Sequence, residues 1–205
     1  HNKNVEFQLA SAEGVDQERK VLLTNHGEIA YDYLVLAAGA TTNFFGNESV
    51  AQNSYPMKSL QEAIALRSHL VHEFERAARV NETDDDERQR HLNFVIVGGG
   101  ATGIELAGAI IELIDVFKKE YHSLDFSRVH VILLEAMGSV LPMVPPDLQQ
   151  KTIDVLRKKG VDVRLNTAVT DYDGSTLSLK GGDVIPTKTV IWAAGVRAQD
   201  FIKDC

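Results

Sequence analysis

The fold of this 205-residue chain is decided by the stretch Asn93-Phe94-Val95-Ile96-Val97-Gly98-Gly99-Gly100-Ala101-Thr102-Gly103-Ile104-Glu105-Leu106-Ala107-Gly108. Its apolar run from Phe94 to Val97 is rich in β-branched residues and favours a buried parallel strand. Gly98, Gly100 and Gly103 then fill the glycine positions of the pattern G-x-G-x-x-G, and a helical pattern begins at Ala101. The stretch therefore predicts a strand, a phosphate-binding loop and a helix, in that order.

Each glycine of this loop has a physical task. Gly98 permits the tight turn out of the strand, Gly100 lets a diphosphate approach the backbone without meeting a Cβ, and Gly103 lets the helix pack closely on the sheet. A helix that begins at Ala101 presents unpaired N–H groups and the positive end of its dipole to the phosphates. Because glycine-rich turns also follow strands for purely structural reasons, the interpretation needs support from the next strand.

That strand ends in an acid, as a dinucleotide site requires. The apolar run from Val129 to Leu134 is followed by Glu135, whose carboxylate can accept hydrogen bonds from the ribose hydroxyls of adenosine. A 2′-phosphate about 4 Å away would be opposed by roughly 4 kcal/mol per unit charge pair at an effective dielectric near 20. We therefore predict NAD(H) rather than NADP(H). The acid lies further along than the usual ~20 residues, and a solvated strand-end carboxylate is the structural alternative.

Composition narrows the class of protein. A hydrophobic content of 44% over 205 residues is enough for the core of one or two domains. The net charge of −8 argues against nucleic-acid binding through a basic surface. No apolar run approaches the ~20 residues that cross a bilayer. The only cysteine is Cys205, so the chain has no internal disulfide and no dithiol redox pair.

The first part of the chain has the pattern of short strands. Val5 to Leu9 alternates in polarity, Val21 to Leu23 follows, and Asn25 to Glu28 marks a hairpin turn. Tyr33 to Ala37 predicts a buried strand that ends at the turn Ala38-Gly39-Ala40-Thr41-Thr42. Ligands bind at such turns in open α/β sheets, although a plain turn is the commoner explanation.

A helix and a loop are predicted between this part and the central stretch. Ser59 and Glu62 match a capping box, which begins a helix. His69 and His72 lie one turn apart, but no further ligand accompanies them, so we expect solvated surface rather than a metal site. Residues 81–90 read as an exposed polar loop. The predicted inward face of the helix consists of Leu60, Ile64, Leu66, Leu70, Val71 and Phe74.

The last third predicts a helix, a strand and a second meander. The helix begins at Pro145-Pro146-Asp147 and ends before Gly160, with an inward stripe of Leu148, Thr152, Val155 and Leu156. Val161 to Leu165 joins the parallel sheet, and residues 169–185 form the meander. Thr189 to Trp192 then leads into Ala193-Ala194-Gly195, as Tyr33 to Ala37 leads into Ala38-Gly39. Two similar strands around one nucleotide-binding unit suggest a domain inserted into another, within a longer protein.

The ordered combination of these motifs resembles the two-dinucleotide-binding flavoproteins of the pyridine nucleotide-disulfide oxidoreductase superfamily, and within it the type II NADH dehydrogenases. The resemblance covers essentially the whole chain. It implies an α/β fold, with a Rossmann-like parallel sheet and β-meander for NADH and incomplete pieces of a similar FAD-binding domain. The segments that carry it are 31–40 (YDYLVLAAGA), 42–46 (TNFFG), 57–60 (MKSL) with Ala63, Arg67 and 74–77 (FERA), 97–108 and 191–197 (IWAAGVR).

The resemblance also implies domain boundaries and site residues. Residues 1–52 would be a partial FAD-binding domain, 53–188 the NADH-binding domain, and 189–205 a strand that returns to the first. Glu105 would lie in the first turn of its helix near the nicotinamide; a favourably placed acid at a helix N-terminus is the alternative. The NADH side and the domain junction would be Gly98, Gly99, Gly100, Ala101, Thr102, Gly103, Glu105, Glu135, Ala194 and Gly195, with Gly195 facing the FAD side, and the FAD side itself would be Ala38, Gly39, Ala40, Thr41 and Thr42.

The activity implied is that of an FAD-dependent NADH:quinone oxidoreductase of the respiratory chain, in which hydride passes from NADH to FAD and electrons pass on to quinone. No side chain need act as a nucleophile, and no metal is expected. The full-length protein would be cytoplasmic and peripheral to the inner face of the membrane, with homodimerisation left open. We expect this chain alone to be soluble, to bind NADH, to retain no FAD and to be inactive. The alternatives are a flavoprotein reductase of ferredoxin or disulfides and a non-catalytic NADH-responsive binding module.

Overall fold

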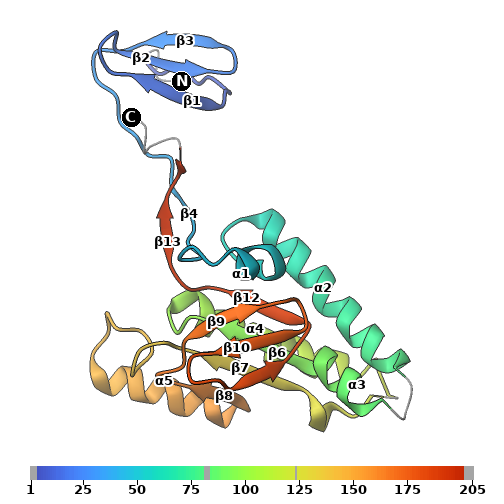
Figure 1. The fold of residues 1–205 in the computed structure, drawn as a ribbon. Helices are drawn as coiled ribbons and strands as arrows, with labels where there is room; N and C mark the ends of the chain where they lie inside the picture. The colour runs from blue at the N-terminus through green and yellow to red at the C-terminus, as the bar shows by residue number, and fades with distance from the viewer. Residues whose placement is uncertain (1–3, 81–83, 123, 201–205) are drawn as a thin grey trace. The chain divides into compact units, whose positions relative to one another are not determined.

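The computed structural model describes residues 4–80, 84–122 and 124–200 (Figure 1). The chain divides into two compact units, His1–Thr41 with Val196–Cys205, and Thr42–Gly195. Cys205 lies outside the described residues. In the described part of the chain, no helix is both long enough and apolar enough to cross a membrane.

The first unit contains a three-stranded antiparallel meander. It is formed by β1 (Ala12–Asp16), β2 (Val21–Thr24) and β3 (Gly27–Ala30), and the predicted hairpin turn joins β2 to β3. The strand predicted over Val5 to Leu9 is wrong, since these residues form no strand and β1 follows them. The apolar side chains of this segment are 72 to 85% exposed at Val5, Phe7 and Leu9. The alternation of polar and apolar residues is therefore present, but no sheet face covers the apolar side chains.

The predicted buried strand over Tyr33 to Ala37 is also absent. These residues have no regular structure, and the side chains of Tyr33 and Val35 are 94% and 86% exposed. A strand needs a neighbour for its backbone groups, and the described residues place none beside this segment. After this segment, regular structure resumes at β4 (Ala40–Thr42), which pairs with β13 (Val196–Ala198).

The second unit is built on a five-stranded parallel sheet. Its order is β5 (Tyr55–Pro56), β12 (Thr189–Trp192), β6 (Asn93–Val97), β7 (His130–Leu134) and β8 (Val161–Arg164). The predicted central strand is therefore the middle strand, with Val97 opposite both Trp192 and Leu134. Thr189 to Trp192, which the sequence assigned to the return toward the first domain, pairs in parallel with β6 along its whole length.

Helices cover one face of this sheet (Figure 1). They are α2 (Leu60–Arg79), α3 (Asp85–Leu92), α4 (Ala101–Phe117) and α5 (Pro146–Lys158). The capping box of Ser59 and Glu62 is formed as predicted, and Gly160 follows α5 at a φ of +92°.

The exposed loop predicted over residues 81–90 is wrong from Asp84 onward. Asp84 caps α3 by accepting a hydrogen bond from the Glu87 N–H, and the helix continues to Leu92. Residues 81–83 lie outside the described part of the chain. A run of acids can begin a helix, since negative charge is favourable at a helix N-terminus.

The faces that these helices bury differ in part from the predicted stripes. On α2, Leu60 and Ile64 are mostly exposed, whereas Leu66, Leu70 and Phe74 are buried. On α5, Leu148 and Val155 are 47% exposed, and the inward residues are Ile153 and Leu156. Both helices carry apolar residues on more than one side, and the sheet fixes which side is covered. The helix-side core also contains Ala77, Ala107, Ile110, Ile114, Phe117, Phe94, Ile96, Val131, Leu133, Val161, Val163 and Ile191.

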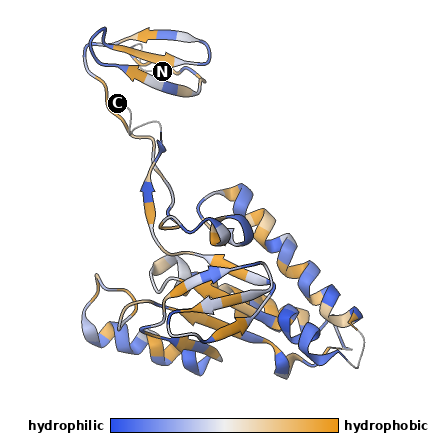
Figure 2. Ribbon diagram, viewed as in Figure 1, coloured by the Kyte–Doolittle hydropathy of each residue, from blue (hydrophilic) through white to orange (hydrophobic). Residues whose placement is uncertain are grey.

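The opposite face of the sheet is covered by the second meander and by α1 (Glu48–Asn53). The meander consists of β9 (Val169–Tyr172), β10 (Thr176–Leu179) and β11 (Val184–Pro186). Tyr172 and Leu177 pack there against the alternate residues of the central strands, such as Val95. Figure 2 shows this distribution of hydropathy: hydrophobic residues predominate in the strands of the sheet, and the helices carry many polar residues. The predicted α/β fold with a parallel sheet and meander is thus confirmed.

Candidate functional site

The predicted phosphate loop lies at the carboxyl end of β6, between the ends of β12 and β7. Gly98 has a φ of +117°, and its N–H donates a hydrogen bond to the Leu134 carbonyl oxygen at 2.8 Å. A Cβ at Gly98 would lie only 2.8 Å from the Ala193 carbonyl carbon. Glycine is therefore required at this position both by conformation and by the close approach of the turn after β12.

The next two glycines differ in what surrounds them. A Cβ at Gly103 would lie 1.9 Å from the Gly98 carbonyl oxygen, which explains the close contact of α4 with the loop. A Cβ at Gly100 would meet nothing within 4 Å. Gly100 is the N-cap of α4, and no side chain caps that helix. The first amides of α4 therefore have no side-chain acceptor, and an anion can accept their hydrogen bonds.

Glu135 follows β7 directly and reaches the phosphate loop. Its Oε2 accepts a hydrogen bond from the Gly99 N–H at 2.6 Å, and its Oε1 accepts one from the Met137 N–H at 2.7 Å. The half-buried carboxylate thus joins the loop after β6 to the loop after β7. A carboxylate oxygen has two lone pairs, so each oxygen can still accept a hydrogen bond from a ribose hydroxyl.

The loop after Glu135 is part of the site, and sequence reasoning missed it. The Leu141 N–H donates a hydrogen bond to the Gly99 carbonyl oxygen at 2.9 Å, and fully buried Val140 packs beside Gly99. The Asn166 N–H donates to the Met137 carbonyl oxygen at 2.9 Å. These contacts are between backbone groups or to an ordinary aliphatic side chain, so no motif announces them.

The remaining predicted residues fall in several environments. Ala194 is half-buried and follows Ala193, whose N–H donates to the Val97 carbonyl oxygen at 2.8 Å; Gly195 is exposed with a φ of +76°. Glu105 is the fifth residue of α4 and exposed, so its predicted place in the first turn is wrong. On the predicted FAD side, Ala38 and Gly39 are exposed in irregular chain, and β4 contains the half-buried Ala40, Thr41 and Thr42.

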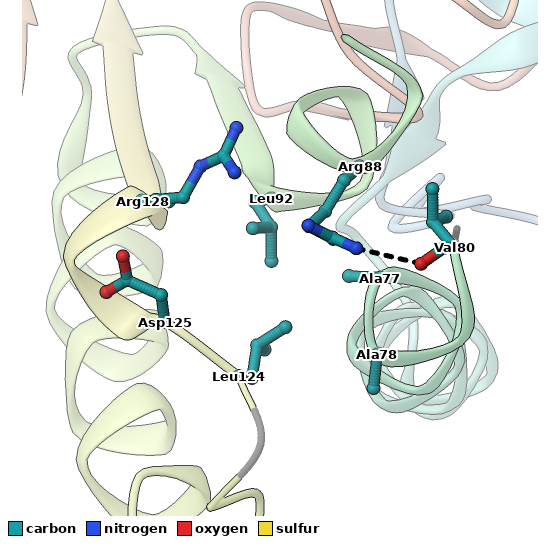
Figure 3. Close-up of a pocket in the computed structure, with 8 residues that line it drawn as sticks. All are labelled: Ala77, Ala78, Val80, Arg88, Leu92, Leu124, Asp125 and Arg128. Carbon is teal, nitrogen blue, oxygen red and sulfur yellow. Dashed lines mark hydrogen bonds between the residues drawn. The ribbon is translucent and has the colours of Figure 1, made fainter. Parts of the chain in front are cut away.

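A cavity of about 270 Å³ lies at the opposite, amino edge of the sheet (Figure 3). Its two arginines are already engaged. Arg88 donates a hydrogen bond to the Val80 carbonyl oxygen at 2.8 Å, and both Arg88 and Arg128 pair with Asp85, at 3.5 and 2.9 Å. This cavity is therefore less suited to an anionic ligand than the uncapped end of α4.

A buried polar cluster lies on α2, where the sequence predicted solvated histidines. Glu73 is fully buried, and its carboxylate binds His91 Nδ1 at 2.6 Å and Arg76 at 2.8 Å. His69 contradicts the prediction of solvated surface, because its ring is 12% exposed and bonds Thr189 Oγ1 at 2.9 Å; His72 is exposed as predicted. In the described ranges no three His, Cys, Asp or Glu side chains are grouped to hold a metal ion.

Comparison with known proteins places this chain in a family. The chain is 34% and 38% identical to the type II NADH:quinone oxidoreductases Ndh and NdhA of Mycobacterium tuberculosis, over 98% of its length, and covers 45% and 44% of theirs. It thus spans less than half the length of these relatives. The solved structure of NDH2 from Plasmodium falciparum in complex with NADH matches 95% of this chain and 42% of its own, with a TM-score of 0.87 at 22% identity. The family model for pyridine nucleotide-disulphide oxidoreductases matches residues 1–204, so the chain belongs to that family.

Proposed function

We propose that this chain is the NADH-binding portion of a flavoprotein NADH:quinone oxidoreductase. The observation that carries the proposal is the open, uncapped N-terminus of α4 at Gly100, next to the Glu135 carboxylate. The two features supply amide donors for a diphosphate and acceptors for the ribose of adenosine at the same end of the sheet. The names of the mycobacterial relatives, which are 34% and 38% identical, support the choice of NADH and quinone as substrates.

The residues of this site would bind and orient the nucleotide. The amides that follow Gly100 accommodate the diphosphate, and Glu135 accepts hydrogen bonds from the adenosine ribose and disfavours a 2′-phosphate. In the parent enzyme, FAD would supply the acceptor of the nicotinamide hydride. The chemistry needs no protein nucleophile, so the contribution of this chain is alignment of the nicotinamide and exclusion of water.

We further propose that the NADH-binding domain lies within the unit Thr42–Gly195 and that this chain alone retains no FAD. The exposure of Tyr33 and Val35 supports the second proposal, because a flavin site built on that segment would need them packed. Quinones dissolve in lipid, so the parent enzyme would meet its acceptor at the membrane surface.

The test is calorimetric titration of the 205-residue chain with NADH and NADPH. We expect NADH to bind at least roughly tenfold more tightly, a difference of ~1.4 kcal/mol. Gly100→Ala should abolish measurable binding without unfolding the chain, because its Cβ would enter space that is open in the fold. Gly108→Ala, at a second open glycine of α4, is the control and should bind normally. Equal affinity of NADH for wild type and Gly100→Ala would refute the proposed site.

A further inference from the structure

The sheet order fixes the direction in which a bound dinucleotide must run. The phosphate loop follows the middle strand β6, Glu135 follows β7 on one side, and Ala193 follows β12 on the other. A diphosphate on the loop with its adenosine ribose at Glu135 must therefore extend its other half toward the end of β12. This direction rests on the proposed function, and it brings the nicotinamide half to the turn Trp192–Gly195.

That turn is held by a segment almost 150 positions away in sequence. The Trp192 indole N–H donates a hydrogen bond to the Asn43 carbonyl oxygen at 2.9 Å, and the Asn43 N–H donates to the Gly195 carbonyl oxygen at 3.3 Å. The Asn43 side chain in turn accepts a hydrogen bond from the Phe45 N–H at 2.9 Å. Asn43 is thus hydrogen-bonded to both ends of the turn, and its side chain also fixes the backbone of its own segment at Phe45.

Phe45 packs against the same turn at a conformational cost. Its φ of +53° lies in the left-handed region, which is unfavourable for a bulky residue with a Cβ. Its ring lies 6.5 Å from the Trp192 ring in an edge-on arrangement, and a Cβ at Gly195 would be 2.6 Å from its Cζ. The side chain is nevertheless 68% exposed, so burial in the core does not account for the strain. Strained, exposed aromatic residues of this kind call for a functional explanation.

We infer that Asn43 and Phe45 form a clamp that positions the nicotinamide half of NADH by holding the Trp192–Gly195 turn against the phosphate loop. Backbone atoms of Ala193 and Ala194 lie less than 3 Å from where a Cβ of Gly98 would stand, so a displaced turn changes the surroundings of the loop on that side. On the adenosine side, the Glu135 carboxylate accepts its hydrogen bonds from the Gly99 and Met137 N–H groups rather than from the clamp. Asn43 and Phe45 are therefore positioning residues for one half of the ligand.

The test compares NADH with ADP-ribose, which keeps the adenosine and diphosphate but lacks the nicotinamide ring. In the 205-residue chain, Phe45→Gly removes the ring and also relieves the left-handed strain. We expect NADH affinity to fall roughly two- to tenfold, the range that aromatic contacts supply. Affinity for ADP-ribose should stay unchanged, and Phe45→Tyr should retain NADH affinity. Lys20→Gly, which relieves a φ of +51° in the first meander, is the matched control and should affect neither ligand.

The outcomes separate this proposal from the one on which it rests. Wild-type chain that binds neither NADH nor ADP-ribose would overturn the proposed function and the clamp together. Two results would overturn the clamp alone, provided that the wild-type chain binds both ligands. One is an unchanged NADH affinity in Phe45→Gly, and the other is an equal loss of affinity for NADH and for ADP-ribose. Thermal unfolding followed by circular dichroism checks that Phe45→Gly folds. If it does not, Phe45→Leu gives the same comparison with the side chain shortened rather than removed.

Discussion

The carboxylate of Glu135 accepts a hydrogen bond from the Gly99 N–H at 2.6 Å, so the acid predicted to select the nucleotide also holds the predicted phosphate loop. Together with the hydrogen bond from the Met137 N–H at 2.7 Å, it fixes two loops that follow neighbouring strands. The geometry of both loops therefore depends on the side chain that, under the proposed function, would also select the nucleotide.

Replacement of Glu135 by glutamine should impair both properties. An amide NH2 group would face a backbone N–H in place of one carboxylate oxygen, and the loss of a charge-assisted hydrogen bond costs about 1.5–3 kcal/mol. We expect roughly tenfold or greater loss of NADH affinity by calorimetry and a smaller preference over NADPH. Glu112→Gln, at an acid of α4 with 75% side-chain exposure, serves as the control. An unaltered preference for NADH in Glu135→Gln would contradict this role.

The glycines of α4 provide a matched pair for testing its packing. Gly103→Ala places a Cβ 1.9 Å from the Gly98 carbonyl oxygen and should destabilise the fold by about 1–3 kcal/mol. Gly108→Ala meets nothing within 4 Å and should stabilise it by up to about 1 kcal/mol, because alanine is the better helix former. Denaturant unfolding measures both. Equal effects of the two substitutions would show that the close contact at Gly103 is not important.

The buried cluster on α2 predicts loss of stability in acid. Burial lowers the pKa of His69 and outweighs the opposing effect of Glu73. Burial would raise the pKa of Glu73, but the hydrogen bond with His91 and the charges of His69, His91 and Arg76 outweigh it and lower that pKa. Both pKa values are lower in the fold than in the unfolded chain, so the unfolded state binds more protons and stability rises with pH.

We therefore expect the free energy of unfolding to fall as pH drops below the usual His value of 6.5, and again below the usual Glu value of 4.5. Glu73→Gln should cost about 1–3 kcal/mol at neutral pH, since one carboxylate oxygen becomes an amide NH2 group, so that either His91 or Arg76 loses its acceptor, and the charge that both partners face is removed. The variant should also show a flatter pH dependence in urea unfolding. Glu75→Gln, two residues along the same helix, is the control, and a Glu73→Gln profile parallel to wild type would argue against the assignment.

Exposure of the segment Tyr33 to Ala37 predicts the colour of the purified chain. With Tyr33 and Val35 in solvent, we expect no stoichiometric flavin absorption in the visible spectrum. Addition of FAD should leave the spectrum that of free flavin. A yellow preparation whose flavin survives gel filtration would show that Ala38 to Thr42 bind it without a packed strand before them.

The sequence predicted the nucleotide-binding half better than the first part of the chain, and the reason is physical. The strand from Phe94 to Val97, the loop glycines and the start of α4 each have local requirements that residue type reveals. Tyr33 to Ala37 has the same apolar character, but a strand exists only where a neighbour pairs with it. Residue type cannot supply that neighbour.

The features that sequence reasoning missed depend on contacts between distant segments. His69 looked like a surface residue because its partner, Thr189, is 120 positions away. Asn43 and Phe45 belong to one of the segments that carry the family resemblance. Their contacts with Trp192 could not be predicted, because they depend on where β12 lies in the sheet. Val140 and Leu141 reach Gly99 through ordinary packing and a backbone hydrogen bond, which leave no pattern in sequence.

Trp192 is the only tryptophan of the chain, and it stands one residue before the alanine that touches Gly98. Its indole emission overlaps the near-ultraviolet absorption of reduced nicotinamide, so a bound reduced cofactor would quench it by energy transfer while the oxidised form would not. The fold thus places a native optical reporter beside the predicted phosphate loop, and if the proposed site binds NADH, its occupancy and redox state could be followed in real time without a label.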